Sequence, residues 1–277
     1  MQRKRLLTTL LRLAIRYPKL FIVALLLGGL SYMYEVFIAR DTMCFMGVPQ
    51  ALDARSEHWT RVFRNQAYMV GYSDLKANPL WVVYKLVPPP NEGSSLKRPE
   101  SFSRDWRNLG FITQDDYTHS GYDRGHMAPN FAIARLYGKT AQYETFLMTN
   151  ITPQKPSLNQ KIWQRLEEAE IETFAPKYKV LWVYTGPLFE GRSQTLKSSA
   201  WIQIPSAFYK FYVGIDANDQ LHTFGVIIPQ NAKPNDSLER YTVSIDEIER
   251  RSGFDFLCDL DDAIEAKIEA SQGEKWF

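Results

Sequence analysis

An uncharged apolar run, Leu20 to Tyr34, divides the chain into two unequal parts. It is preceded by six basic residues: Arg3, Lys4, Arg5, Arg12, Arg16 and Lys19. A basic flank before an apolar stretch of about 20 residues is typical of a segment that targets a membrane. We therefore expect residues 1–40 to form a basic n-region with a transmembrane or signal-anchor helix, and residues 41–277 to form a single domain with its core at about 64–260.

Cleavage of the N-terminal segment as a signal peptide is the competing interpretation, because a basic n-region and an apolar core serve both purposes. No small-x-small pattern follows the apolar run, where tyrosine, methionine and glutamate stand instead, and this favours an uncleaved anchor. The excess of Lys and Arg before the run then places the domain outside the cytoplasm, on the periplasmic side of the inner membrane if the chain is bacterial. Secretion after cleavage is the alternative location.

Charge is distributed unevenly along the chain. The first 40 residues carry a net charge of +6 and the remainder a net −4, so the formal +2 of the whole chain does not describe the domain. Residues 97–165, in contrast, have a local excess of four positive charges. A local basic surface is what the attraction of a polyanion requires.

The two cysteines, Cys44 and Cys258, both follow the predicted anchor. In an oxidising compartment they could form a disulfide that joins the two ends of the domain. Two unrelated thiols are an equally weighted alternative. Two cysteines are too few for a zinc site.

Hydrophobic periodicity predicts an α+β domain, with two groups of strands and helices inserted among them. The expected strands are 68–72 and 80–86 as a hairpin, a short buried strand at 146–148, a central strand at 178–184, and a second hairpin of 207–213 with 221–228. The expected helices are 51–61, 131–145, one that starts near 158, 245–251 and 260–270.

The polar stretch Ser120 to Asn130 contains the clearest candidate for chemistry, His126. A histidine that is neutral near pH 7 can act as a general base, and Arg124 supplies a cation two residues earlier. Gly125 between them allows a close approach of the backbone or an unusual φ. Phosphodiester hydrolysis needs a base, a cation and a way to stabilise the departing oxygen, so this stretch indicates phosphate chemistry. His58, His119 and His222 are expected to be structural.

A second polar segment, Thr149 to Gln154, leads into the helix that carries Asn159 and Glu167. Eight residues along an α-helix correspond to a rotation of only about 80° and a rise of ~12 Å. The two side chains cannot both bind one ion directly, unless one of them acts through water, as Mg²⁺ prefers. Trp163, between them, is expected to pack in the core.

These three elements together resemble the DNA/RNA non-specific endonucleases of the ββα-metal (His-Me finger) fold, a family that includes endonuclease G-like and sugar-nonspecific nucleases. The resemblance rests on Tyr122 to His126, Asn150 to Gln154, and Leu158 to Glu167. It implies antiparallel sheets with inserted helices, and a metal-dependent endonuclease that cuts DNA and RNA without sequence specificity to give 5′-phosphate ends.

The resemblance also implies roles for individual residues. His126 would be the general base, Asn159 the direct ligand of Mg²⁺ (or of Mn²⁺ or another divalent ion), and Glu167 a ligand acting through water. Arg124 would bind the scissile phosphate and Asn150 would help to position the histidine. Asp123, Gly125 and Trp163 would be structural support.

The match is incomplete at two places. The upstream phosphate-binding arginine is ambiguous between Arg98 and Arg104, and Ile171 stands where some family members have an arginine. Asp105 and Arg107 read as parts of a solvated charged loop.

Two rival functions stay open: a nucleic-acid-binding module with weak catalysis, and a phosphodiesterase for small substrates. The expected partners are DNA and RNA and, through the N-terminal segment, a membrane. Whether the chain forms a homodimer stays open as well.

Overall fold

The computed structural model describes residues 9, 12–13, 15–90, 96–192 and 194–271. The chain forms two compact units, Met1–Thr42 and Met43–Phe277. In the first unit, helix α2 (Pro18–Tyr34) continues into a π-helical turn, Glu35–Ala39. Part of the predicted basic n-region, Arg3, Lys4 and Arg5, lies outside the described residues.

The N-terminal helix has the length and composition of a membrane span. The helical stretch Pro18–Met43 has a mean hydropathy of 1.9 in its most apolar window, and none of that window is buried. A signal sequence near the N-terminus meets the same test. The structure therefore agrees with a membrane-targeting segment of either kind.

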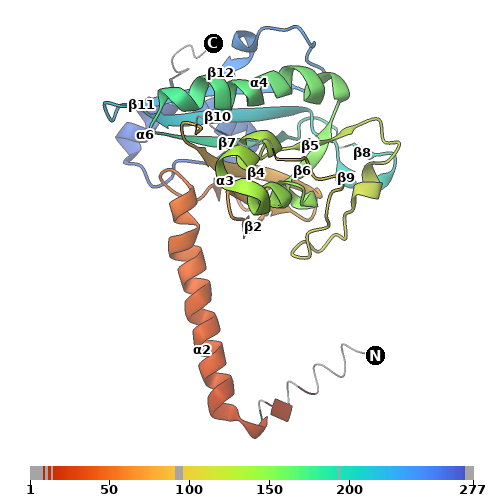
Figure 1. The fold of residues 1–277 in the computed structure, drawn as a ribbon, viewed down its shortest axis with the longest axis vertical. Helices are drawn as coiled ribbons and strands as arrows, with labels where there is room; N and C mark the ends of the chain where they lie inside the picture. Colours follow the sequence, from red (N-terminus) through yellow and green to blue (C-terminus); the bar gives the residue numbers. More distant parts are fainter. Residues whose placement is uncertain (1–8, 10–11, 14, 91–95, 193, 272–277) are drawn as a thin grey trace. The chain divides into compact units, whose positions relative to one another are not determined.

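The second unit is built on an antiparallel sheet of seven strands in the part of the chain that the structure describes (Figure 1). In sheet order they are β12 (Thr242–Val243), β11 (Leu221–Pro229), β10 (Ala207–Ile215), β7 (Val180–Leu188), β4 (Asn78–Leu86), β3 (Tyr68–Ser73) and β2 (Arg61–Arg64). The central strands alternate side chains between two buried faces, as the two-residue period of a strand requires. Val82 and Tyr84 point to one face, and Trp81 and Val83 to the other.

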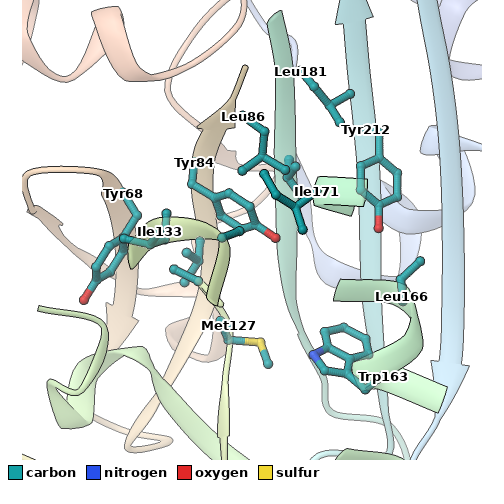
Figure 2. Close-up of a cluster of buried hydrophobic side chains, with 14 of the residues drawn as sticks. Tyr68, Tyr84, Leu86, Met127, Ile133, Trp163, Leu166, Ile171, Leu181 and Tyr212 are labelled. Atoms are coloured by element: carbon teal, nitrogen blue, oxygen red, sulfur yellow. The ribbon is translucent and has the colours of Figure 1, made fainter. Parts of the chain in front are cut away.

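One face of the sheet is covered by helices inserted between β4 and β7. These are α3 (Asn130–Thr145) and a continuous helical stretch that contains α4 (Gln164–Ala169) between π-helical turns at Leu158–Trp163 and Glu170–Phe174. A separate two-stranded unit, β5 (Asp123–His126) with β6 (Ile151–Gln154), flanks α3 in the chain. Figure 2 shows the resulting core, in which Leu166 and Trp163 of the helical stretch face Tyr212 of the sheet.

The opposite face of the sheet is covered by α5 (Ile245–Ser252) and by the residues that follow it. The remaining elements are short: β1 (Gln50–Ala51) pairs with β13 (Phe254–Asp255), β8 (Thr195–Leu196) pairs with β9 (Ser199–Gln203), and α6 (Asp262–Glu269) follows near the end.

Most of the expected elements are confirmed, including both hairpins and the helices at 158, 245–251 and 260–270. The helix at 131–145 is present too, but it is interrupted at Gly138, which has a φ of +81°.

The helix expected around 51–61 is limited to the 3-10 turn Ser56–His58. Before it, Asp53 accepts hydrogen bonds from the Arg55 backbone and side chain and holds a loop. The predicted strand at 146–148 is wrong. Its ladder-type contact is a bridge to Ser103, while the Phe146 and Leu147 amides donate to the carbonyls of Tyr143 and Glu144 in the preceding helix.

A buried ion pair joins the sheet to the helical stretch. Lys210 of β10 donates to Glu170 at 2.5 Å, and both side chains are fully buried. Glu170 also accepts hydrogen bonds from the hydroxyls of Tyr84 (2.6 Å) and Tyr212 (3.0 Å). The ammonium of Lys210 lies 4.7 Å from the centroid of the Trp163 ring. These contacts fix the rotation of the helix about its axis.

Neither Cys44 nor Cys258 is part of a disulfide in this structure. Cys44 is buried, while Cys258 is partly exposed and its Sγ accepts a hydrogen bond from Gln50 at 3.3 Å. Burial raises the pKa of the Cys258 thiol to about 11. Of the two alternatives that the sequence left open, this structure shows two separate thiols rather than a disulfide.

Candidate active site

A cavity of about 850 Å³ opens between the β5–β6 unit and the helical stretch. Its walls contain most of the residues that the sequence singled out: Arg98, Asp123, Arg124, His126, Asn159 and Glu167. Arg104, Asn150, Trp163 and Gly125 are not among the lining residues. Segments that are far apart in the sequence thus meet in one pocket.

The imidazole of His126 lies at the end of β5, enclosed by two aromatic rings. The ring centroids of Phe102 and Phe146 are 5.4 and 4.8 Å from that of His126. Burial lowers the pKa of His126 to about 3, and the positive charge of Arg98 adds to the effect. Its Nε2 atom is buried and has no hydrogen-bond partner among the described residues. The ring is therefore neutral at ordinary pH, with a nitrogen able to accept a proton.

Asn150 acts on the backbone that follows the histidine. Its side chain accepts a hydrogen bond from the Ala128 amide (2.9 Å) and donates to the carbonyls of Ala128 (3.0 Å) and Thr145 (2.9 Å). Its own carbonyl accepts from the Met127 amide at 3.0 Å. The buried carboxamide thus fixes residues 127–128 and, through them, the end of the strand that presents His126.

Arg124 and Gly125 are arranged by neighbours of β5. The guanidinium of Arg124 donates twice to the Gln114 carbonyl, at 3.1 and 2.8 Å, and its Cζ lies 5.6 Å from the centroid of the Phe102 ring. A Cβ on Gly125 would collide with the amide of Gln154, which packs against the strand. Close packing therefore requires the glycine.

Asn159 is oriented by Asp123. The Nδ2 atom of Asn159 donates to Asp123 Oδ2 at 2.9 Å, and Gln160 Nε2 donates to the same oxygen at 2.8 Å. Because this assigns the nitrogen of the carboxamide, Oδ1 is left as the acceptor, and the described residues give it no hydrogen-bond donor. An amide oxygen in a pocket with a carboxylate is the kind of oxygen ligand that Mg²⁺ prefers.

The carboxyl group of Glu167 lies in the same wall, two turns further along the helix. Burial raises the pKa of Glu167 to about 8; Lys210 opposes this shift and the neighbouring Glu170 reinforces it. A carboxyl group withdrawn from water favours either a proton or a bound cation. The donor set of Asn159 and Glu167 therefore suits a hydrated divalent ion.

The two candidate arginines for the upstream phosphate contact differ in position. Arg98 lines the pocket, with its guanidinium carbon 5.2 Å from the Phe146 ring centroid. Arg104 instead lies over Phe111, at 3.9 Å, and does not line the pocket. The geometry favours Arg98.

Ile171 is fully buried in the core, where Figure 2 shows it among Leu86, Leu181 and Tyr84. An arginine at this position would point into the core rather than toward a phosphate. The pocket wall beyond Glu167 is formed instead by Glu168 and by Glu172, which pairs with Arg135 at 2.6 Å.

The sequence interpretation missed part of the support around the site. Asp105 was expected to be solvated in a charged loop, but it is buried. Its carboxylate accepts hydrogen bonds from Arg107 (2.7 Å) and from the hydroxyl of Thr149 (2.7 Å), the residue before Asn150. Phe102, which forms the aromatic wall, was also missed. Its position between Arg98 and Arg104, the two candidate phosphate-binding arginines, could have indicated that it lies near the site. His58 and His222 pair with Asp53 and Asp216, outside the pocket.

Comparison with known proteins agrees with this geometry. A family model described as DNA/RNA non-specific endonuclease matches residues 55–263. The chain is 31% identical over 205 residues to human mitochondrial endonuclease G, covering 69% of this chain and 68% of that protein. It is 31% identical over 225 residues to a nuclease of Nostoc sp. strain PCC 7120, covering 75% of this chain and 76% of that protein. A chain in the crystal structure of an EndoG/EndoGI complex matches its fold with a TM-score of 0.66 at 24% identity, covering 80% of this chain and 91% of that chain.

Proposed function

Because the chain belongs to the DNA/RNA non-specific endonucleases, a family of hydrolases, we propose that it cleaves the phosphodiester bonds of DNA and RNA without reading their sequence. The observation that carries this proposal is the neutral His126 in one pocket with Arg98, Arg124 and the Asn159–Glu167 pair. A base, cations and oxygen ligands around one cavity are the groups that phosphodiester hydrolysis needs.

In the proposed reaction, the neutral imidazole of His126 accepts the proton of the attacking water. Arg124, held by the Gln114 carbonyl, and Arg98, at the edge of the pocket, bind the charged phosphate. Asn159 Oδ1 would bind a divalent ion directly, with Mg²⁺ as our first choice and Mn²⁺ as an alternative, while Glu167 would hold one of its waters. When bound, such an ion stabilises negative charge on the phosphorus oxygens and on the leaving 3′-oxygen, which would give 5′-phosphate and 3′-hydroxyl ends. The antiparallel pair β5–β6 and the helix that follows β6 would then be the ββα-metal unit of the fold.

Cleavage of supercoiled plasmid and of single-stranded RNA by the full-length chain in detergent tests this function. We expect both polymers to be cut in the presence of Mg²⁺ and neither in EDTA. His126→Ala should reduce the rate by about 10²- to 10⁴-fold, the usual contribution of a general base, and Asn159→Ala should also lose most activity. His222→Ala is the matched control, since this histidine pairs with Asp216 outside the pocket.

Three results would contradict the proposal. Full activity of His126→Ala would show that His126 is not the general base. Folded protein that retains DNA without cutting it would indicate a binding module. Equal rates on polymer and on a small phosphodiester, with little effect of salt, would indicate a small-substrate phosphodiesterase.

We also propose that residues 1–40 anchor the nuclease domain to a membrane, with the domain on the side away from the cytoplasm. The supporting observations are the apolar helix α2 and the basic residues that precede it. A reporter enzyme fused after residue 40 should be active outside the cytoplasm. A fusion that is active only in the cytoplasm would refute this topology.

A further inference from the structure

The loop of residues 103–113 exposes three large apolar side chains close together. Trp106 is 85% exposed, Leu109 69% and Phe111 66%. Single exposed apolar residues are ordinary on a protein surface, but several in one short loop mark an interaction site.

The exposure is built into the loop, because its inward side is pinned to the domain. The buried Asp105 carboxylate binds Arg107, whose guanidinium also donates to the Arg64 carbonyl (3.2 Å) and to Asn65 Oδ1 (2.8 Å). The Leu109 amide donates to Asp74 Oδ1 at 2.8 Å. A loop held in this way cannot turn its apolar side chains inward.

Phe111 is held in an unfavourable backbone conformation. Its φ of +51° lies in the left-handed region, which a bulky residue rarely adopts. The guanidinium of Arg104 lies 3.9 Å from the centroid of the exposed ring. The fold thus keeps an aromatic face and a cation together at the surface against a local conformational cost.

The residues on either side of the loop are connected to the pocket. Phe102, immediately before the loop, lines the pocket against His126. Its amide donates to Gln114 Oε1 at 3.1 Å, and the Gln114 carbonyl binds Arg124. The loop that carries the exposed side chains therefore starts directly after a residue of the pocket wall and ends at a residue that holds Arg124.

We propose that the 103–113 loop is a stacking platform for unpaired nucleobases of the strand whose phosphate occupies the pocket, an inference that rests on the proposed function. Every nucleobase has a π face, so stacking on Trp106 and Phe111 binds single strands without sequence preference. Arg104 and Arg98 supply charge for the adjoining phosphates. The platform gives the enzyme a preference for single-stranded or distorted substrates over regular duplex, whose bases are already stacked.

Binding without cleavage tests the platform. We would measure fluorescence anisotropy of a labelled twelve-nucleotide oligo(dT) and of a labelled duplex of the same length, with full-length protein in detergent and EDTA. Trp106→Ala should weaken single-strand binding by about 10-fold and duplex binding by much less. Trp59→Ala is the control, since Trp59 is 62% exposed but lies in another segment.

A second variant separates stacking from folding. Phe111→Gly removes the ring and relieves the positive φ, so it should keep or raise Tm while it weakens single-strand binding. Unchanged oligo(dT) binding by both variants, or an equal loss for duplex and single strand, would overturn the proposal.

The same variants separate this platform from a membrane contact and from the proposed function. In nanodiscs of brominated lipid, a quenching difference between wild type and Trp106→Ala, without any effect on oligo(dT), would assign the loop to the membrane surface and overturn the proposal. Wild-type protein that binds oligo(dT) through Trp106 but cuts no polymer would refute the nuclease function and support the platform. If wild-type protein cuts polymer normally and Trp106→Ala binds oligo(dT) as tightly as wild type, the platform is refuted and the nuclease function is not.

Discussion

At the scale of single residues, the site depends on side chains that direct other side chains. Asp123 was predicted to be structural support, and it accepts hydrogen bonds from Asn159 and Gln160. Asn150 fixes the backbone after His126. Removing a residue that orients a metal ligand commonly weakens metal affinity by about 10- to 100-fold.

Asp123→Ala should therefore raise the Mg²⁺ concentration needed for half-maximal cleavage by about 10-fold or more, because the Asn159 carboxamide loses the partner that sets its orientation. A titration of plasmid cleavage with Mg²⁺ measures this change. Glu168→Ala is a matched control, since Glu168 lines the same pocket but is bonded to Gln164. Equal shifts of the half-maximal Mg²⁺ concentration in the two variants would mean that Asp123 acts only through its negative charge and does not orient Asn159.

The raised pKa of Glu167 predicts how stability depends on pH. The ordinary pKa is 4.5 and that in the folded domain is about 8, so between these values the unfolded chain ionises while the folded domain retains a proton. The unfolded state then binds fewer protons, and the stability of the domain in EDTA falls as pH rises through this window. Mg²⁺ favours the carboxylate and should reduce the loss.

Tm measured at pH 5 and pH 7.5 for wild type and Glu167→Gln checks this. In EDTA, the Tm of the variant should fall less between pH 5 and pH 7.5 than the Tm of wild type. At pH 7.5, Mg²⁺ should raise the Tm of the variant by less than that of wild type. Identical behaviour of the two proteins would show that Glu167 does not titrate in this range. Comparison with the variant is needed because burial also raises the pKa of Glu249 and Glu269.

At the scale of elements, the helical stretch from Leu158 to Phe174 holds the predicted metal side chains through its contact with the sheet. Its contact with β10 includes the fully buried pair Lys210 and Glu170. Breaking such a pair leaves one uncompensated buried charge.

Lys210→Met should lower the free energy of unfolding by about 3–5 kcal/mol, and the double variant Lys210→Met with Glu170→Gln should be less destabilised than the single one. Urea unfolding of residues 43–277, which form a compact unit, measures both. A double variant as unstable as the sum of the two single variants would show that the charges do not interact.

The sequence predicted strands and helices where a single period dominates, as in the two hairpins of the sheet. It could not predict the π-helical turns at Leu158–Trp163 and Glu170–Phe174. The first of them contains Asn159 and changes the angle between Asn159 and Glu167 from that of an ideal α-helix. Nor could it predict that Asp105 is buried, because its partner Thr149 is 44 residues away. His126, Arg124 and Asn159 were found because their neighbours in the chain form a recognisable pattern, whereas Phe102 joins the site only through the fold.

At the scale of the whole molecule, the charge of the chain and the charge of the site differ. The domain after residue 40 is acidic overall, yet Arg98 and Arg124 lie in the pocket beside Asp123, Glu167, Glu168 and Glu172. Attraction of a polyanion therefore depends on a few local arginines rather than on net charge.

Cleavage of polymer should weaken steeply with NaCl, because each phosphate contact releases counterions. Arg98→Gln should lower the slope of log(kcat/KM) against log[NaCl] by about one. Lys179→Gln, which removes a cation that pairs with Asp219, should leave the slope unchanged. A slope that is the same for wild type and Arg98→Gln would exclude Arg98 from contact with phosphate.

The pairing of β1 with β13 joins residues 50 and 51 to residues 255 and 254. The two strands lie at opposite ends of the domain sequence. During synthesis β1 is therefore made long before β13, and it cannot pair until β13 has been made. Folding of the domain therefore cannot be completed before β13 has been made. If residues 1–40 anchor the chain as proposed, the partly assembled domain would stay at its site of export until the last strands arrive.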